Sequence, residues 1–347
     1  MPQIGTMSRL SFLPTLSSVR TPLETSVVIY DARLEKVSRE FRVWVRKFPA
    51  RLPVRAGEEL KDLSHFPARL AKFTKTAESI PARSLTIVAV GGGSVGDFAA
   101  FLASVYKRGV DLVHVPSTWL AAIDSSHGGK SALNAGGAKN QIGTFHPARE
   151  VFLVRSLLEA QPSERAQDAM SELAKIALID GGTWVKSLRS SRLEGAALLW
   201  KFLRPAIRAK MKIVARDPRE RSGVRQILNL GHTFGHVIEA DLGWTHGRAV
   251  AQGLFFALEM SESAGFANEK DFEAALALLA RMGLHPERPK KPMRAATVRS
   301  LLAKDKKRHA RGAVTFVFLR KAGRPERRDV PIDRIVQEAA RLGWVRA

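Results

Sequence analysis

The sequence contains no cysteine. Disulfide bonds and thiolate ligands are therefore excluded, and any metal ion must be held by histidine and carboxylate side chains. Aromatic residues make up only 7% of the chain and show no zinc-finger or base-stacking pattern, which weakens a nucleic-acid-binding interpretation. The most apolar segment, residues 85–106, is too interrupted by glycines 91–93 and by Asp97 to span a membrane. Since residues 1–24 also lack the apolar core of a secretory signal, we expect a cytoplasmic protein.

Acidic residues are scarce beside basic ones. The chain has 33 Asp and Glu against 56 Lys and Arg, which gives a formal net charge of +23. Such a balance is typical of a nucleic-acid-binding protein or of an enzyme that attracts an anionic substrate. A basic surface spread without pattern is the third interpretation. Because the basic residues recur along the whole chain and do not form one tail, we disfavour nucleic-acid binding as the main function.

The first half of the chain has the pattern of an α/β domain. Apolar runs at residues 26–30, 85–90, 112–115 and 151–154 predict buried strands, and residues 41–45 also alternate like a strand. The second of these runs ends at a glycine-rich turn, residues 91–97, and a helix to about residue 106 follows. A strand, glycine turn and helix in this order can seat a phosphate group, although a simple tight turn explains the glycines equally well.

Polar loops follow the run at residues 112–115. Residues 124–130 and 136–140 each combine paired glycines with a lysine, and we interpret them as cationic loops beside a ligand. After about residue 155 the pattern becomes helical, which predicts an α/β domain at 1–157 and an all-α domain at 158–347. The helices are expected at residues 162–179, 197–215, 222–242, 248–264, 270–282 and 332–342, with a late strand at 314–319.

Histidines gather in the helical half. His232 and His236 are four residues apart, so a helix would place both imidazoles on one face, and His246 follows ten residues later. This spacing suggests a divalent-metal site completed by a carboxylate. The alternative is that each histidine is an ordinary core residue, and the spacing alone does not choose the ligands.

Together these motifs resemble the 3-dehydroquinate synthase family of sugar-phosphate cyclases. The resemblance covers roughly residues 25–320, and its motifs occur in the family's order. They are Gly91-Gly92-Gly93-x-x-Gly96-Asp97, Arg108-Gly109, Pro116-x-Thr118, Asp124-Ser125-Ser126-x-Gly128-Gly129-Lys130, Lys139-Asn140-x-Ile142-Gly143, Glu172-x-x-Lys175, residues 228–236, His246-Gly247 and Asp305-Lys306-Lys307.

The resemblance implies an NAD-binding α/β domain, a helical metal-binding domain and a homodimer. It assigns a zinc or cobalt ion to Glu172, His232 and His246, which makes His236 a substrate or proton contact and not a ligand. It implies NAD contacts at Asp31, Glu58, Lys61, Gly92, Gly93, Asp97, Ser117, Thr118, Asp124, Lys130, Lys139 and Asn140. It implies substrate contacts at Arg108 (across the dimer), Lys130, Asn140, Lys175, Lys210, Arg225, Asn229, His236 and Lys306.

The implied reaction converts 3-deoxy-D-arabino-heptulosonate 7-phosphate to 3-dehydroquinate and phosphate. It proceeds by transient oxidation with NAD, β-elimination of phosphate, re-reduction and intramolecular aldol closure, as a step of the shikimate pathway. A sister cyclase with another sugar phosphate and a non-catalytic basic relative that binds nucleic acid are the alternatives. One departure from the family stands beside a ligand, because Arg248 replaces the usual Glu two residues after His246.

Overall fold

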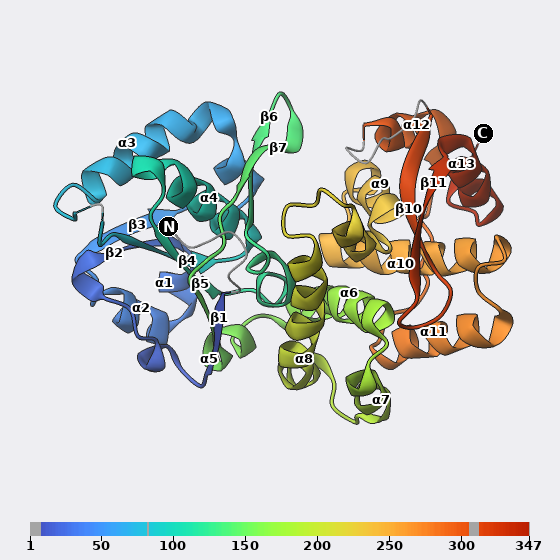
Figure 1. Cartoon of the computed structure of the whole chain (residues 1–347), viewed down its shortest axis with the longest axis horizontal. Coiled ribbons are helices and arrows are strands. Elements are labelled where there is room, and N and C mark those ends of the chain that lie inside the picture. The colour runs from blue at the N-terminus through green and yellow to red at the C-terminus, as the bar shows by residue number, and fades with distance from the viewer. Residues whose placement is uncertain (1–7, 82, 305–311, 347) are drawn as a thin grey trace. The chain divides into compact units, whose positions relative to one another are not determined.

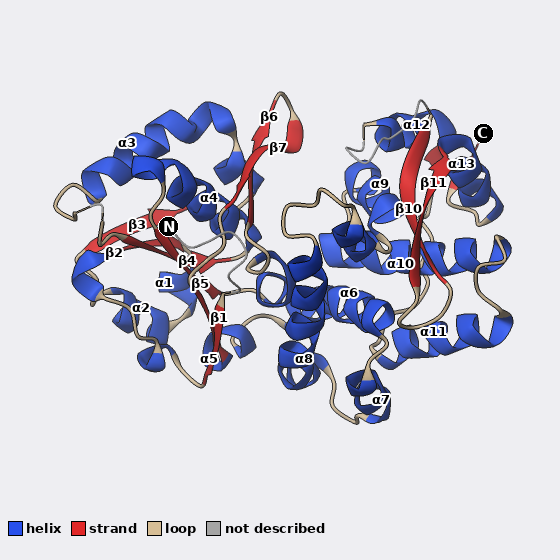
Figure 2. Ribbon diagram, in the orientation of Figure 1, coloured by secondary structure: helices blue, strands red, loops and turns tan. Residues whose placement is uncertain are grey.

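The computed structural model describes residues 8–81, 83–304 and 312–346. The chain divides into two compact units, Met1–Arg165 and Ala166–Ala347, which are described here separately (Figures 1 and 2). Within the described residues, no helix combines the length and the apolar character needed to cross a membrane.

The first unit is built on a parallel six-stranded sheet. Its strand order is β1-β8-β5-β4-β2-β3, and every ladder in it is parallel. The strands are β1 (Arg9–Leu13), β2 (Ser26–Asp31), β3 (Ala50–Val54), β4 (Thr86–Gly91), β5 (Asp111–Pro116) and β8 (Glu150–Val154). The four predicted apolar runs are β2, β4, β5 and β8, because continuous apolar runs suit strands covered on both faces. The more polar β1 and β3 were not predicted.

Residues 41–45 form a helix, so the prediction of a strand there was wrong. They belong to α2 (Arg39–Val45), and the Ser38 hydroxyl caps this helix by accepting a hydrogen bond from the Phe41 amide at 3.1 Å. Phe41, Trp44, Val45 and Phe48 are all buried, which is the i, i+3, i+4, i+7 spacing of a helix. A five-residue window is too short to separate this period from a strand's alternation.

Helices cover both faces of the sheet. Helices α1 (Leu34–Val37) and α2 follow β2 and pack on one face, whereas α3 (Phe66–Thr76) and α4 (Gly93–Val105) lie on the other (Figure 1). The connections that leave β2 and β4 therefore run to opposite faces. In an open parallel sheet this switch opens a ligand-binding crevice at the carboxyl ends of the two strands.

Short elements surround that crevice. They are η3 (Glu58–Lys61), η4 (Leu63–His65), η6 (Ala121–Ser125), β6 (Lys130–Ala135), β7 (Ala138–Phe145) and α5 (Arg155–Glu159), whereas η5 (Tyr106–Arg108) precedes β5 at the other end of the sheet. Residues 130–145, predicted in part as loops, form the antiparallel β6–β7 hairpin. Ser131 and Leu133 are buried on one side of β6, so the hairpin is anchored by alternate residues.

The second unit is predominantly helical, which confirms the predicted fold class. Its helices are α6 (Ser163–Asp180), α7 (Thr183–Ser190), α8 (Gly195–Arg216), η7 (Val224–Asn229), α9 (His232–Leu242), α10 (His246–Ser263), α11 (Glu269–Arg281), α12 (Ala295–Ala303) and α13 (Ile332–Arg341). Two small sheets accompany them: antiparallel β10 (Ala313–Leu319) with β11 (Pro325–Pro331), and parallel β9 (Met293–Arg294) with β12 (Val345–Arg346). The predicted strand at 314–319 is β10.

The single helix predicted at residues 222–242 is interrupted. Leu230 is extended (ψ 125°) and Gly231 is left-handed (φ 79°), so η7 ends before α9 begins at His232. Glycine tolerates the left-handed conformation that ends a helix. The hydrophobic period of residues 222–242 does not indicate this break. The break puts His232 at the first position of a new helix.

Candidate active site

A glycine cradle lies where β4 ends in the first unit. Gly92 caps α4, and a Cβ atom placed on Gly92 would lie 3.1 Å from Thr118 Cγ2, while one on Gly93 would lie 3.3 Å from Ser125 Oγ. Side chains here would narrow the crevice, so the glycines keep the backbone amides of the α4 N-terminus open to a ligand. Such an arrangement suits the phosphates of a dinucleotide.

Lys61 connects three elements at the same edge. Its Nζ lies 2.7 Å from Asp97 Oδ2 on α4 and donates to Asn140 Oδ1 on β7 at 2.5 Å. Lys61 is buried, and the Asp97 side chain is 22% exposed. Burial raises the pKa of Asp97, and the attraction of Lys61 opposes this shift. The pair therefore fixes a carboxylate at the rim of the crevice.

The other predicted nucleotide contacts lie on elements around this crevice. Asp31 ends β2 and pairs with Arg33 (Nη2 to Oδ2, 2.8 Å), and Glu58 Oε2 accepts from Asn134 Nδ2 at 2.9 Å. Asn134 Oδ1 also accepts from the Asn140 amide at 2.9 Å. Sequence reasoning missed Asn134. Ser117 and Thr118 directly follow β5, Asp124 lies on η6, and Lys130 and Lys139 lie on the β6–β7 hairpin.

Glu172, His232 and His246 meet in the second unit. His232 Nε2 lies 3.3 Å and His246 Nε2 lies 3.7 Å from Glu172 Oε1, and one ligand atom of each residue lies within 4.8 Å of the others. Glu172 is fully buried on α6, and its oxygens accept no hydrogen bond among the described residues, although Lys175 Nζ lies 2.5 Å from Oε2 and the two imidazoles face Oε1. A buried carboxylate oxygen between two imidazoles fits a divalent cation.

Backbone packing brings the three ligand candidates together. A Cβ atom on Gly247 would lie 2.0 Å from the Asp168 carbonyl oxygen, so only glycine allows the start of α10 to lie against α6. Thr245 caps α10 by accepting from the Arg248 amide, and its hydroxyl donates to Asp168 Oδ1 at 2.6 Å. These contacts fix the start of α10 against Asp168, which lies one helical turn before Glu172 on α6. His246, the first residue of α10, is thereby held beside Glu172.

Each imidazole is oriented by a second hydrogen bond. His232 Nδ1 donates to the Leu230 carbonyl at 3.3 Å, and His246 Nδ1 donates to Glu239 Oε2 at 2.9 Å. In both rings Nε2 then faces Glu172, which is the arrangement of a metal-binding histidine. Sequence reasoning missed Glu239, although it lies seven residues after His232 and so on the same helix face.

Electrostatic interactions in this cluster are strong. Although burial alone would raise the pKa of Glu172, Lys175 and His232 hold it well below its usual range; Lys175 Nζ lies 2.5 Å from Glu172 Oε2. Burial and the nearby Lys175 lower the pKa of His232. Burial would also lower the pKa of His246, but Glu172 and Glu239 raise it to about 10. The carboxylate is therefore ionised and ready to bind a cation.

The predicted substrate contacts are divided between regions of the structure. Lys175 and Lys210 are buried on α6 and α8, Arg225 is buried on η7, and Asn229 ends η7. The exposed ring of His236 has its centroid 5.3 Å from that of His232. Arg108 is exposed at φ 71° before β5, so it lies at the sheet edge opposite the glycine cradle. Lys306 falls outside the described residues.

Arg248 faces away from the ligand cluster. Its guanidinium carbon lies 3.8 Å from the centroid of the Trp244 ring, and its Nη2 pairs with Glu287 Oε2 at 2.6 Å. The side chain is 47% exposed. The substituted cation therefore has partners of its own and does not contact Glu172 or His246.

Family models match both units of the chain. A model described as 3-dehydroquinate synthase N-terminal matches residues 51–168, and one described as 3-dehydroquinate synthase C-terminal matches residues 169–308. The chain belongs to the 3-dehydroquinate synthase family. The similar solved structures include a 2-deoxy-scyllo-inosose synthase and a 2-epi-5-epi-valiolone synthase, so the comparisons support a sugar-phosphate cyclase without choosing its substrate.

Solved structures show the same fold for this family member. A 2-deoxy-scyllo-inosose synthase complexed with carbaglucose-6-phosphate, NAD+ and Co2+ is 27% identical, covers 96% of this chain and 98% of its own, and gives a TM-score of 0.82. A 2-epi-5-epi-valiolone synthase from Streptomyces hygroscopicus subsp. jinggangensis 5008, with NAD+ and Zn2+ bound, is 20% identical over 97% of each chain, with a TM-score of 0.80. A probable glycerol dehydrogenase from Sinorhizobium meliloti 1021 is more distant, at 15% identity and a TM-score of 0.57.

Proposed function

We propose that this cyclase is a 3-dehydroquinate synthase, acting on 3-deoxy-D-arabino-heptulosonate 7-phosphate. The observation that carries the proposal is the pair of buried cations Lys210 and Arg225, on the contacting elements α8 and η7. A cationic side chain held in a buried position is a strong hydrogen-bond donor for an anionic group of a substrate. Two such donors can serve a carboxylate as well as a phosphate, which favours a substrate that carries both groups, whereas the ammonium of Lys175 is already paired with Glu172 at 2.5 Å.

NAD and a divalent metal suit the groups that are present. The glycine cradle before α4 would hold the dinucleotide phosphates, and Glu172, His232 and His246 would hold zinc or cobalt. Bound NAD would accept and return a hydride, and the bound cation would lower the pKa of a coordinated hydroxyl. The structural relatives that contain NAD+ with Co2+ or Zn2+ support both assignments.

The protein's own side chains then hold and orient the substrate. Arg225 is fixed from two sides, because its amide donates to Asp217 Oδ2 and its Nη1 donates to the Pro218 carbonyl, both at 3.2 Å. A guanidinium fixed in this way can bind a carboxylate with little loss of conformational entropy. His236 is exposed beside the buried His232, so it can exchange a proton with substrate while the ligand histidines cannot.

A phosphate-release assay tests the substrate. The protein is incubated with NAD+ and Zn2+ or Co2+, and with the heptulosonate phosphate, sedoheptulose 7-phosphate or glucose 6-phosphate in parallel. We expect release only from the heptulosonate phosphate. Arg225→Gln should lower kcat/KM about 10–100-fold, the loss expected for one charged hydrogen-bonding group. Arg219→Gln, an exposed arginine in the neighbouring loop, is the matched control and should leave kcat/KM unchanged.

The second candidate is a sister cyclase whose substrate has no carboxylate. The similarity to 2-deoxy-scyllo-inosose synthase and to valiolone synthase favours it. Phosphate release from glucose 6-phosphate or sedoheptulose 7-phosphate, together with none from the heptulosonate phosphate, would establish this candidate and reject the first.

A further inference from the structure

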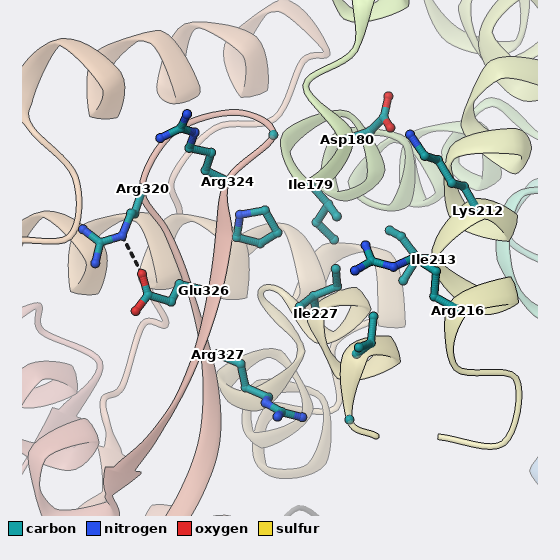
Figure 3. Close-up of a pocket in the computed structure, with 14 residues that line it drawn as sticks. Ile179, Asp180, Lys212, Ile213, Arg216, Ile227, Arg320, Arg324, Glu326 and Arg327 are labelled. Atoms are coloured by element: carbon teal, nitrogen blue, oxygen red, sulfur yellow. Dashed lines mark hydrogen bonds and ion pairs between the residues drawn. The ribbon is translucent and has the colours of Figure 1, made fainter. Parts of the chain in front are cut away.

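A separate cavity in the second unit is lined by none of the residues discussed as catalytic, cofactor-binding or metal-binding. Its volume is about 610 Å³, and it lies among the ends of α6 and α8, η7 and the turn that joins β10 to β11 (Figure 3). This volume is in the range of small-molecule binding pockets, roughly 300–1,000 Å³. Five cationic and two acidic side chains line it.

The walls of this cavity are held in place by contacts within the protein. The Gly323 amide donates to the Leu178 carbonyl at 2.8 Å and ties the β10–β11 turn to the end of α6. Arg327 lies directly over Gly223, where a Cβ atom would be 1.6 Å from Arg327 Nη1. The same Nη1 donates to Gln226 Oε1 at 3.0 Å. A cavity with fixed walls loses little entropy when a ligand binds.

Both acidic side chains in the cavity are already engaged. Asp180 Oδ2 accepts a hydrogen bond from Trp184 Nε1 at 2.7 Å, and Glu326 Oε2 accepts one from Arg320 Nε at 2.5 Å. Figure 3 shows the Arg320–Glu326 pair on the strand side of the cavity, away from Arg216. Arg320 offsets the charge of Glu326, whereas Asp180 keeps its negative charge, so the five cations of the lining still outnumber the two acids.

Among the described residues, four of the five cations have no acidic partner, and one of these four, Arg327, is bonded to Gln226 Oε1. Lys212, Arg216 and Arg324 form no ion pair with any acid in the part of the chain that the structure describes. Arg216 reaches from α8 toward the centre of the cavity (Figure 3). Figure 3 shows Lys212 extending toward Asp180 and Arg324 at the edge of the hollow, so Arg216 is the cation best placed for a ligand, and its guanidinium matches the oxygens of a phosphate.

The remaining lining is apolar. It consists mainly of Ile179, Ile213, Val224, Ile227 and Pro325. An inorganic ion would leave this surface in contact with water, whereas a ligand with an apolar ring would cover it. We propose that the cavity binds an organic phosphate that carries a flat apolar ring, of the nucleoside monophosphate kind. This proposal does not depend on the identity of the cyclase substrate.

Isothermal titration with AMP tests the site. The full-length protein is first saturated with NAD+, so that AMP cannot occupy the glycine cradle, and inorganic phosphate is titrated in parallel. We expect AMP to bind more tightly than phosphate. Arg216→Gln should weaken AMP binding about tenfold or more, since a charged hydrogen bond contributes that much. Arg208→Gln removes an exposed arginine of the same helix outside the cavity and should change AMP affinity less than about twofold.

Three outcomes would overturn the proposal. They are no AMP binding up to millimolar concentration, equal losses in the two variants, and equal affinity for AMP and phosphate. A single-stranded oligonucleotide is included because of the basic surface. If the oligonucleotide binds, AMP does not, and both variants weaken oligonucleotide binding equally, the protein binds anions through its basic surface in general and not through this cavity. Unchanged thermal midpoints and NAD+ affinity in both variants would show that each is folded.

Discussion

His246 Nδ1 donates a hydrogen bond to Glu239 Oε2 at 2.9 Å, on the ring edge opposite Glu172. Once a bound cation displaces the proton on Nε2, the contact keeps the other proton on Nδ1 and so leaves Nε2 as the ligand atom. We therefore predict that Glu239→Gln weakens the binding of Zn2+ or Co2+ about 10–100-fold, as loss of such an orienting partner commonly does. Competition with a chromophoric chelator on the metal-stripped protein measures this without reference to turnover.

Glu287→Gln is the matched control for Glu239. It also removes one carboxylate beside the start of α10, but Glu287 pairs with Arg248 and does not contact His246. We expect its metal affinity to equal that of the original protein. Equal losses in the Glu239 and Glu287 variants would show that net charge, and not the bond to His246, determines the affinity.

The two histidines of α9 should have different roles. His232 points at Glu172, whereas His236 is exposed beside it, so His232→Ala should lose the metal and the activity together. His236→Ala should keep one metal per chain and lose about 10²–10⁴-fold in kcat, the usual contribution of a general acid or base. Metal analysis and kinetics on the same preparations separate the two. Loss of metal from the His236 variant would contradict the assignment.

Lys61 should stabilise the first unit through Asp97. Lys61→Met removes the cation 2.7 Å from Asp97 Oδ2 and leaves a carboxylate whose pKa burial already raises. A fully buried broken pair costs roughly 3–5 kcal/mol, and the 22% exposure of Asp97 reduces this to roughly 2–4 kcal/mol. Urea unfolding measures the change. Adding Asp97→Asn should restore part of the lost stability, and strictly additive losses would mean that the two side chains are not coupled.

The sequence predicts four of the buried strands from their continuous apolar runs, and it predicts most of the long helices because their apolar period extends over many residues. Residues 41–45 show the limit, since five positions fit two periods and only the packing of Phe41 and Trp44 decides between them. In the site, the family motifs indicate Glu172, His232 and His246. Glu239 lies on the same helix face as His232, but a partly exposed carboxylate is common on any helix. Its role is recognised only from its hydrogen bond with His246, which depends on how α9 and α10 pack.

The buried His114 of β5 makes the stability of the protein depend on pH. Burial, and to a lesser extent His146, lowers the pKa of His114 from 6.5 to about 4. The unfolded chain therefore takes up a proton near pH 6.5, while the folded protein does so only near pH 4. Between these values the unfolded state binds more protons, so stability falls as the pH is lowered from about 6.5 to about 4.

We predict that this histidine contributes up to about 3 kcal/mol to that loss, from about 1.4 kcal/mol for each pH unit of the interval. The His114→Gln variant lacks the titrating group and should not show this loss. The unfolding free energy of the original protein minus that of the variant should therefore fall by up to about 3 kcal/mol between pH 6.5 and pH 4. His65→Gln, which removes an exposed imidazole from η4, should follow the original protein at every pH. A constant difference between the His114 variant and the original protein from pH 7 to pH 4 would mean that the folded protein binds this proton as readily as the unfolded chain does.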